Sequence, residues 1–394
     1  MFTHITQLLP KKNLRRLAVS IALFWMCLYP IYTNYFYGKG FEHYYRHIAY
    51  LEGRSMFFNP WQYRVLAPAI IEGGFDLYNA TVHRLFDVES YIYGKVSQEE
   101  NNQEKLMRML SADDFVRYNI IFLIFRFSLH IVLYMLLYLQ LKKMTDNHLL
   151  AMIGVSVASL VMGNAVNDSD LSFNTYIDVI LYQLTMLVIL NKKNGWWILL
   201  IVIVGAFNRE TSLLIPFIYF ISQVNFNEIG TKNLLRSIFS QKLFKSANAV
   251  LISALSFVFF CLIFIAIRHF VGYQEYADWR TPRGLPMIKL NLLSFPGIKT
   301  YNEVFGVVAL LPFFGYFYIK KLPSLYCYML LSFVPIWFFV HLSSVVLYQS
   351  RLFLVPTIIV FIPTTIYLIS RARVGNNTQM VTGIIGDNEV SIHR

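Results

Sequence analysis

The sequence predicts an all-α protein that crosses a membrane many times. Of its 394 residues, 56% are hydrophobic and only 14% are charged, and the mean hydropathy is +0.50. A soluble domain carries about a quarter charged residues. The apolar residues also fall in blocks of roughly 20, the length that a helix needs to cross ~30 Å of hydrocarbon. These observations exclude a soluble enzyme, a disordered chain and a disulfide-stapled secreted module.

The apolar blocks predict about ten transmembrane helices, which follow one another along most of the chain. They are residues 15–36, 118–141, 148–165, 176–191, 196–208, 211–223, 247–268, 303–319, 324–342 and 352–370. The blocks 196–208 and 211–223 are too short to cross as straight helices. A backbone interrupted at this depth must be buried in protein or line a wet cavity.

The net charge of +12 does not indicate nucleic-acid binding. Most of the excess lysine and arginine lies in short loops between apolar blocks, where basic residues set the orientation in the membrane. With the N-terminus in the cytoplasm, every inner segment carries a basic pair or more. The three cysteines, Cys27, Cys261 and Cys327, lie inside apolar blocks, so we expect no disulfide framework and no cysteine metal site.

This orientation divides the chain into three parts. Residues 1–14 form a cytoplasmic N-terminus, residues 15–370 the transmembrane domain, and residues 371–394 a disordered cytoplasmic tail. The long segments 37–117 and 269–302 then lie outside the membrane. Loops above ~15 residues are usually functional or have structure of their own. The polar chemistry of the chain is therefore expected on the extracytoplasmic side.

The first outer segment opens with an amphipathic pattern that predicts a helix lying in the membrane interface. Its apolar face is formed by Phe41, Tyr44, Tyr45, Ile48 and Leu51. Further on, Pro60 favours a helix start and Pro68 a kink. The apolar stretch after Pro68 is too short to span, so it packs on the bundle or re-enters the membrane surface.

Glu42 is the first candidate for a catalytic residue. It follows the first span by a few residues, where lipid headgroups meet water, and there it could act as a general base. His43 is a weaker candidate for the same role. The alternative for Glu42 is an ordinary solvated carboxylate on a helix.

Several polar residues are candidates for binding a phosphate. Arg209 and Glu210 lie where the two short blocks meet, and charge at such a depth usually marks a site or a buried ion pair. The guanidinium of Arg209 could donate two parallel hydrogen bonds to a phosphate. Alternatively, this pair only fixes the helix break. The further candidates of this outer rim are Arg64, Asn208, Tyr348 and Arg351, together with Arg268, Arg280 and Arg283.

A metal site is not predicted. Asp168, Asp170 and Asp178 cluster along the sequence, and two carboxylates on one face could hold a divalent ion. Their spacing matches no specific ligand loop, and N-capping by Asp168 or Asp170 is the competing explanation. A divalent cation therefore stays open as a cofactor, with no assigned ligands.

Three motifs resemble the GT-C superfamily of polytopic glycosyltransferases. Glu42-His43-Tyr44-Tyr45 is similar to the acidic-x-Tyr-Tyr pattern of that family's first outer loop. An aromatic and proline-rich element follows at residues 60–68. Phe207-Asn208-Arg209-Glu210-Thr211 resembles a segment found in bacterial members. The resemblance covers roughly residues 15–225, and the last four predicted spans resemble nothing specific.

The resemblance implies a glycosyltransferase that moves a sugar from a polyprenyl-phosphate carrier to a glycan, lipid or protein acceptor. It implies that Glu42 or His43 is the base, and that Tyr45, Arg64, Asn208, Arg209, Glu210, Tyr348 and Arg351 bind substrate. The lipid bilayer is a partner, and a bacterial inner membrane is the expected location.

Two alternatives remain open. A polysaccharide polymerase or ligase would use the same carrier. A transporter of lipid-linked glycans would need no chemistry, but it would be expected to show paired broken spans.

Overall fold

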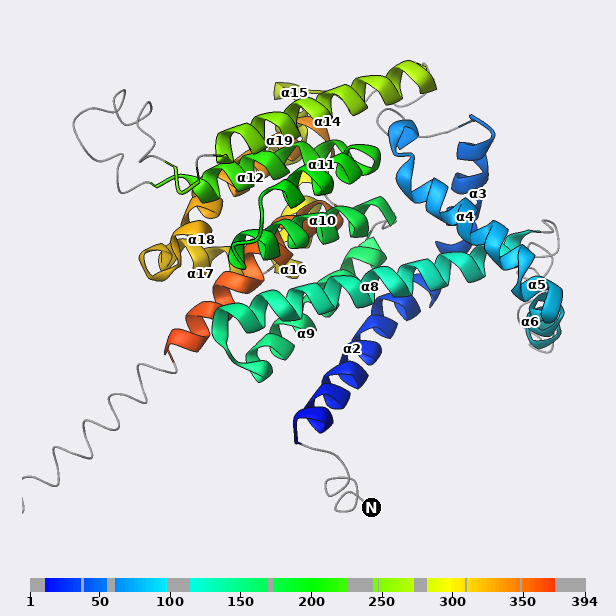
Figure 1. The fold of residues 1–394 in the computed structure, drawn as a ribbon. Coiled ribbons are helices and arrows are strands. Elements are labelled where there is room, and N and C mark those ends of the chain that lie inside the picture. The colour runs from blue at the N-terminus through cyan, green and yellow to red at the C-terminus, as the bar shows by residue number, and fades with distance from the viewer. Residues whose placement is uncertain are drawn as a thin grey trace, which may run out of the picture.

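The protein is a bundle of α-helices. A computed structural model describes residues 11–36, 39–54, 61–97, 114–168, 173–225, 244–246, 248–272, 282–308, 310–347 and 349–372 (Figure 1). Within these ranges there is no β-strand beyond one isolated bridge between Val224 and Phe244. The predicted all-α fold is therefore confirmed for the described residues.

The helices follow in this order: α2 (Lys11–Phe36), α3 (Lys39–Leu51), η1 (Trp61–Tyr63), α4 (Leu66–Ala80), α5 (Val82–Leu85), α6 (Val88–Ser97), α8 (Phe115–Thr145), α9 (His148–Asp168), α10 (Phe173–Leu190), α11 (Trp196–Asn208), η3 (Glu210–Leu213), α12 (Leu214–Gln223), α14 (Ala249–Val271), α15 (Leu285–Leu293), α16 (Phe295–Val308), α17 (Leu311–Phe317), η6 (Ile319–Lys321), α18 (Ser324–Tyr328), η7 (Met329–Phe333), α19 (Val334–Ser344), η8 (Ser350–Phe353), α20 (Leu354–Pro356) and η9 (Thr357–Phe361).

Seven helical stretches in the described ranges are long and apolar enough to cross a membrane, so the chain is a multi-pass membrane protein. They are Asn13–Asn34, Phe115–Thr145, His148–Ala165, Phe173–Leu190, Ala249–Val271, Ser324–Ser344 and Arg351–Ala372. The predicted number of ten is not confirmed. Helices α11 and α12 are short, and the predicted span 303–319 is divided between α16 and α17.

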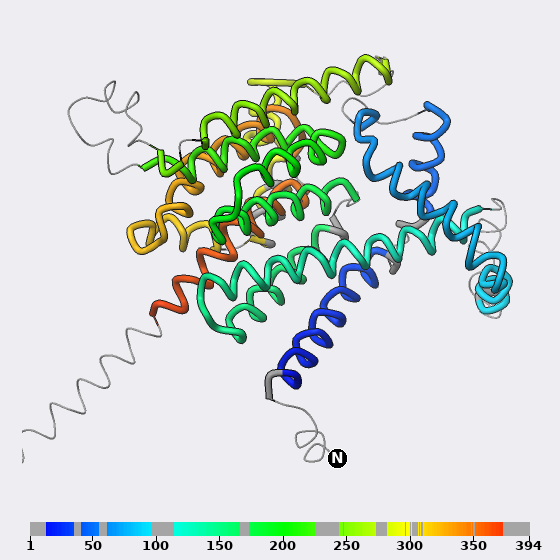
Figure 2. Tube along the Cα trace, in the orientation of Figure 1, coloured from blue at the N-terminus to red at the C-terminus, as the bar shows by residue number. Residues whose placement is uncertain are grey.

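The last span forms the centre of the bundle and α2 lies at its edge. Of the most apolar stretch of Arg351–Ala372, 78% is buried, against 17% for Asn13–Asn34. Helix α2 packs on α8 and α9, α10 packs against both α8 and α11, and α14 covers α11 and α12. The chain trace shows α2 in blue leaning against α8 and α9, with the last helix in red emerging beside them (Figure 2).

The helices between the first two spans gather at the beginning of α8 (Figure 1). A buried histidine holds them there: His47 of α3 lies 2.7 Å from the Glu72 carboxylate of α4. Tyr118 of α8 donates to the same carboxylate at 3.1 Å. The three helices are thereby joined at one carboxylate, so α3 has a fixed position on the bundle.

Two predictions for this segment need correction. The helix at Lys39–Leu51 exists, and Tyr44, Phe41 and Ile48 of the predicted apolar face pack on the core. Tyr45 and Leu51 are exposed instead, and His43 and His47 are buried in their place. The polar partners that α4 and α8 offer explain why the histidines turn inward. Pro68 does not kink a helix, because it lies in the first turn of α4, where its missing N–H has no helical partner to lose. Pro60 lies outside the described residues.

We expect acid to weaken the docking of α3. Burial lowers the pKa of His47 from its usual value, and the bond to Glu72 only partly offsets this. As the pH falls below about 6.5, the unfolded chain gains a proton that the folded chain still refuses, so stability is lost from there downward until the folded-state pKa is passed. The midpoint temperature of thermal unfolding should be lower at about pH 5.5 than at about pH 7.5. The difference between the two pH values should be smaller in His47→Gln than in the parent protein.

The control for this pH series is His83→Gln. The His83 side chain is 45% exposed and pairs with Glu89 at the far end of the loop helices. The unfolding temperature of His83→Gln should depend on pH as that of the parent protein does. An equally reduced pH dependence in His47→Gln and His83→Gln would contradict the role given to His47.

Candidate functional site

A tight helical hairpin carries the Asn208-Arg209-Glu210 motif. Gly195 lies just before α11 and against Tyr219 of α12, so the two short helices run back alongside each other. A Cβ atom on Gly205 would lie 2.6 Å from the Cβ atom of Ser212, so a glycine is needed for η3 to fold back onto α11. Arg209 is extended between them. The charged pair therefore lies at the tip of a hairpin, between the α-helices α11 and α12.

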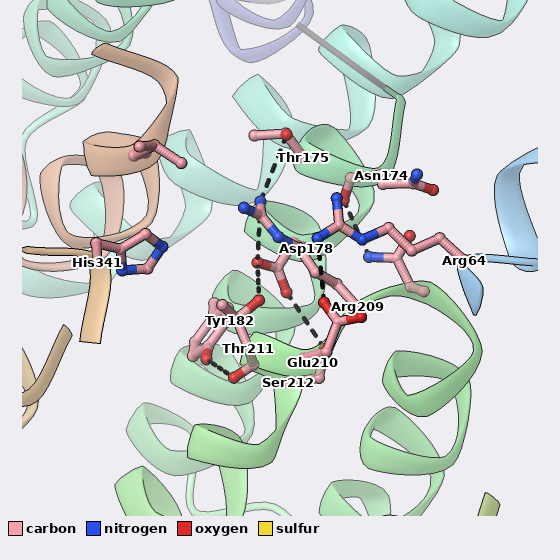
Figure 3. A network of polar contacts seen from close by, with 12 residues as sticks. Arg64, Asn174, Thr175, Asp178, Tyr182, Arg209, Glu210, Thr211, Ser212 and His341 are labelled. Atoms are coloured by element: carbon pink, nitrogen blue, oxygen red, sulfur yellow. Dashed lines mark hydrogen bonds and ion pairs between the residues drawn. The ribbon is translucent and has the colours of Figure 1, made fainter. Parts of the chain in front are cut away.

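A buried aspartate anchors this tip. Asp178 of α10 is fully buried and accepts hydrogen bonds from Thr211 at 2.7 Å and Ser212 at 3.2 Å. The Nη1 atom of Arg209 lies 3.8 Å from the same carboxylate (Figure 3). Tyr182, one turn further along α10, donates to the Thr211 carbonyl. The carboxylate of Asp178 thus fixes both the backbone turn and the guanidinium.

Asn208 ties the hairpin to the beginning of α10. Its side-chain amide donates to the Asn174 carbonyl at 3.0 Å (Figure 3). Arg209 also donates to Thr175 at 3.5 Å. Burial lowers the pKa of the Arg209 guanidinium, the Arg64 cation adds to that effect, and Asp178 opposes it. Arg209 is therefore a cation held in a dry environment close to a second cation.

The second cation is Arg64, which lies in the long segment between the first two spans. Arg64 follows η1, its side chain is 8% exposed, and its Nη2 atom donates to Glu210 Oε2 at 3.1 Å. Arg268, near the end of α14, lies 3.9 Å from the other oxygen of Glu210. Glu210 is therefore placed between two arginines from distant parts of the chain.

Aromatic rings of η1 organise the remaining charges. The guanidinium of Arg64 lies 4.6 Å from the Trp61 ring centre and that of Arg351 lies 5.4 Å from it. Arg268 lies over Tyr63 at 4.3 Å. Cation–π contacts of this kind hold a guanidinium in place without neutralising it. We call Arg64, Arg209, Arg268 and Arg351 the arginine cluster.

The arginine cluster has unused hydrogen-bonding capacity. The Nε atoms of Arg64 and Arg209 are buried and have no hydrogen-bond partner among the described residues. The carboxylates of Asp178 and Glu210 balance only part of the positive charge. A buried unpaired donor costs about 1–3 kcal/mol, and more when it is charged. An anion with several oxygens, such as a phosphate, is the ligand that suits these groups.

The structure brings together most of the predicted binding residues. Arg64, Asn208, Arg209 and Glu210 meet at the hairpin tip, and Arg351 joins them through Trp61. Tyr45 does not join them: it is 54% exposed and packs on Tyr44 of its own helix. Tyr348 lies outside the described residues.

The two candidate bases point in different directions from α3. Glu42 forms an ion pair with Arg46 at 3.1 Å, and 42% of its side chain is exposed. His43 is buried, and Arg126 of α8 donates to its Nε2 atom at 2.8 Å. The His43 ring also contacts Phe173, the first residue of α10, at 5.6 Å between ring centres. His43 therefore reaches the helix that carries the partners of Arg209, whereas Glu42 faces the surface.

Asp178 and Trp61 have roles that the sequence did not indicate. Asp178 was a candidate metal ligand, but its carboxylate is occupied by Thr211, Ser212 and Arg209. Asp170 lies outside the described residues. Among the residues that the structure does describe, no group of three or more histidine, cysteine or acidic residues could hold a metal ion. The one sequence signal for Trp61 is its place three residues before Arg64.

Fold and site define a multi-pass all-α membrane protein with an arginine-rich site built at the tip of a short hairpin. Comparisons with protein-family models, curated proteins and solved structures found no match to this chain. The resemblance to GT-C glycosyltransferases therefore depends on the motifs of the chain itself.

Removing the charge of Asp178 should destabilise the protein. Asp178→Asn leaves Arg209 buried without a counter-ion, and breaking a buried pair in this way costs about 3 kcal/mol. The free energy of unfolding in detergent should fall by that order. Asp146→Asn is the matched control, because Asp146 is 97% exposed and has a left-handed backbone that asparagine also adopts readily. Equal stability of the two variants would contradict the anchoring role.

Proposed function

We propose that the chain is a membrane glycosyltransferase that moves a sugar from a polyprenyl-phosphate carrier to an extracytoplasmic glycan, lipid or protein. The observation that carries the proposal is the arginine cluster. Four segments distant in sequence contribute a guanidinium, and two of these guanidiniums are buried with unused donors. A site of this composition favours a phosphate over an uncharged lipid.

Arg64 and Arg209 would hold the donor phosphate. Both side chains are more than nine-tenths buried, so their attraction for an anion is weakly screened. Arg209 and Arg268 lie at the ends of the apolar helices α11 and α14, and large exposed apolar side chains on α14, such as Leu262 and Ile265, offer a surface for acyl or prenyl chains. A lipid could therefore place its head at the cluster and its tail along the bundle.

Glu42 is the proposed base. It takes a proton from the acceptor hydroxyl as that oxygen bonds to the anomeric carbon. The bond from this carbon to the phosphate oxygen breaks, and its electron pair leaves with the phosphate. Arginines aimed at the phosphate stabilise the charge that develops there. A single displacement of this kind inverts the anomeric centre, and the phosphate leaves without help from an acid.

The contacts of His43 favour Glu42 over His43 as the base. An arginine can only donate, so the Nε2 atom of His43 accepts from Arg126 and is not available to take a proton from substrate. His43 instead fixes α3 against α8 and α10. Glu42, one residue earlier and half exposed, is presented to a substrate that approaches from outside the bundle.

A transporter of lipid-linked glycans is the second candidate. The division of the predicted span 303–319 between α16 and α17 is a further irregular element among the described residues, and broken helices are typical of transporters. Transport would use the same arginine cluster but would not need Glu42. A polysaccharide polymerase or ligase would share the donor and differ only in its acceptor.

A transfer assay in proteoliposomes tests the proposal. With a radiolabelled polyprenyl-phosphate sugar as donor, Glu42→Gln should lower the rate of transfer by about 10²–10⁴-fold, because the general base is lost. Arg209→Lys should also lower it, because an ammonium cannot replace the paired donors of a guanidinium. Glu52→Gln is the control, because Glu52 is a surface carboxylate near the end of the same helix. Translocation of the labelled lipid without any transfer would favour the transporter instead.

A further inference from the structure

The two carboxylates that face the arginine cluster are held very differently. Asp178 is 0% exposed and has three side-chain partners. Glu210 is 29% exposed, and among the described residues its side chain pairs with Arg64 at 3.1 Å and with Arg268 at 3.9 Å. Asp178 is therefore held firmly by its partners on the hairpin tip. Glu210 can keep a partner when it leaves Arg64, because Arg268 lies nearby and both side chains are partly exposed.

Arg64 has the opposite constraint. Its side chain is 8% exposed, so water cannot replace an anion beside it. Removing Glu210 from Arg64 without a substitute would leave a buried uncompensated charge. An exchange of one anion for another avoids that cost, because Arg64 then stays paired throughout.

We propose that Glu210 is a resident anion that a phosphate displaces from Arg64. The inference rests on the proposed function, since the incoming anion is the phosphate of the donor lipid. When the phosphate binds to Arg64 and Arg209, the Glu210 carboxylate moves to Arg268, whose side chain is 30% exposed. Glu210 thus competes with the substrate that its own site binds.

This exchange makes the site selective for charge. A lipid with an uncharged head cannot replace the carboxylate on Arg64, so it meets a site that is already occupied. A phosphate can replace it, and Arg268 lowers the cost by accepting the displaced carboxylate. Glu210 would therefore exclude neutral glycolipids, at the cost of weaker binding of the phosphate lipid.

The experiment measures binding of a fluorescent polyprenyl phosphate to the full chain in nanodiscs. Glu210→Gln keeps the shape of the side chain and removes its charge, so the dissociation constant should fall by about tenfold. The dissociation constant should also fall in Glu210→Ala. This second variant shows whether the amide of the introduced glutamine contributes to the change. Glu52→Gln, a surface carboxylate paired with Arg54, should bind like the parent protein.

A double-mutant cycle tests the part given to Arg268. Arg268→Gln should weaken binding several-fold in the parent protein, since Glu210 loses its second partner. In the Glu210→Gln background, Arg268→Gln should leave the dissociation constant unchanged, because there is no displaced carboxylate for Arg268 to bind. A residue that contacts the phosphate directly would weaken binding in both backgrounds. Competition by inorganic phosphate and by uncharged polyprenol separates the contribution of the charge from that of the lipid tail.

The outcomes distinguish the two proposals. Binding by the parent protein without tightening in Glu210→Gln and Glu210→Ala would overturn the exchange and leave the phosphate site standing. An Arg268 effect that persists without Glu210 would also overturn it. No binding by the parent or any variant would overturn the exchange and the proposed function together.

Discussion

The carboxylate of Asp178 is the interaction on which the rest of the site depends. Asp178 is fully buried in the first turns of α10. It binds the tip of the α11–α12 hairpin through the hydroxyl groups of Thr211 and Ser212 and the guanidinium of Arg209. Without it, the tip of the α11–α12 hairpin would present unpaired polar groups to an apolar bundle. The hairpin is thus anchored to α10 through a charge and not through apolar packing alone.

Everything else in the arginine cluster is arranged around that fixed point. Arg209 is held on one side by Asp178, and Glu210, the next residue, points the other way to Arg64 and Arg268. Adjacent residues in an extended or 3₁₀ segment face apart, which lets one short motif serve both a buried anchor and an accessible rim. The order Arg-Glu at the hairpin tip therefore directs the arginine to the buried Asp178 and the glutamate to Arg64 and Arg268.

The sequence predicted the membrane fold and much of the site for different reasons. The length of an apolar block alone identifies spans such as Phe115–Thr145. Arg209 and Glu210 stand out for another reason, because charged side chains are costly in an apolar setting. The role of Asp178 depends on a contact across 33 positions of sequence, which no local pattern records. The inward turn of His43 and His47 was missed because their partners lie on α4 and α8.

The loose attachment of α2 has a consequence for the helix that follows it. Only 17% of its apolar stretch is buried, the smallest share among the seven spans, so little packing opposes a change in its tilt. Tilt is how a span adjusts to bilayers of different hydrophobic thickness. Helix α3, by contrast, is clamped to α4 and α8 at its histidines. A change in the tilt of α2 is therefore opposed less than a displacement of α3, and the geometry of the arginine cluster is expected to depend little on the thickness of the membrane around it.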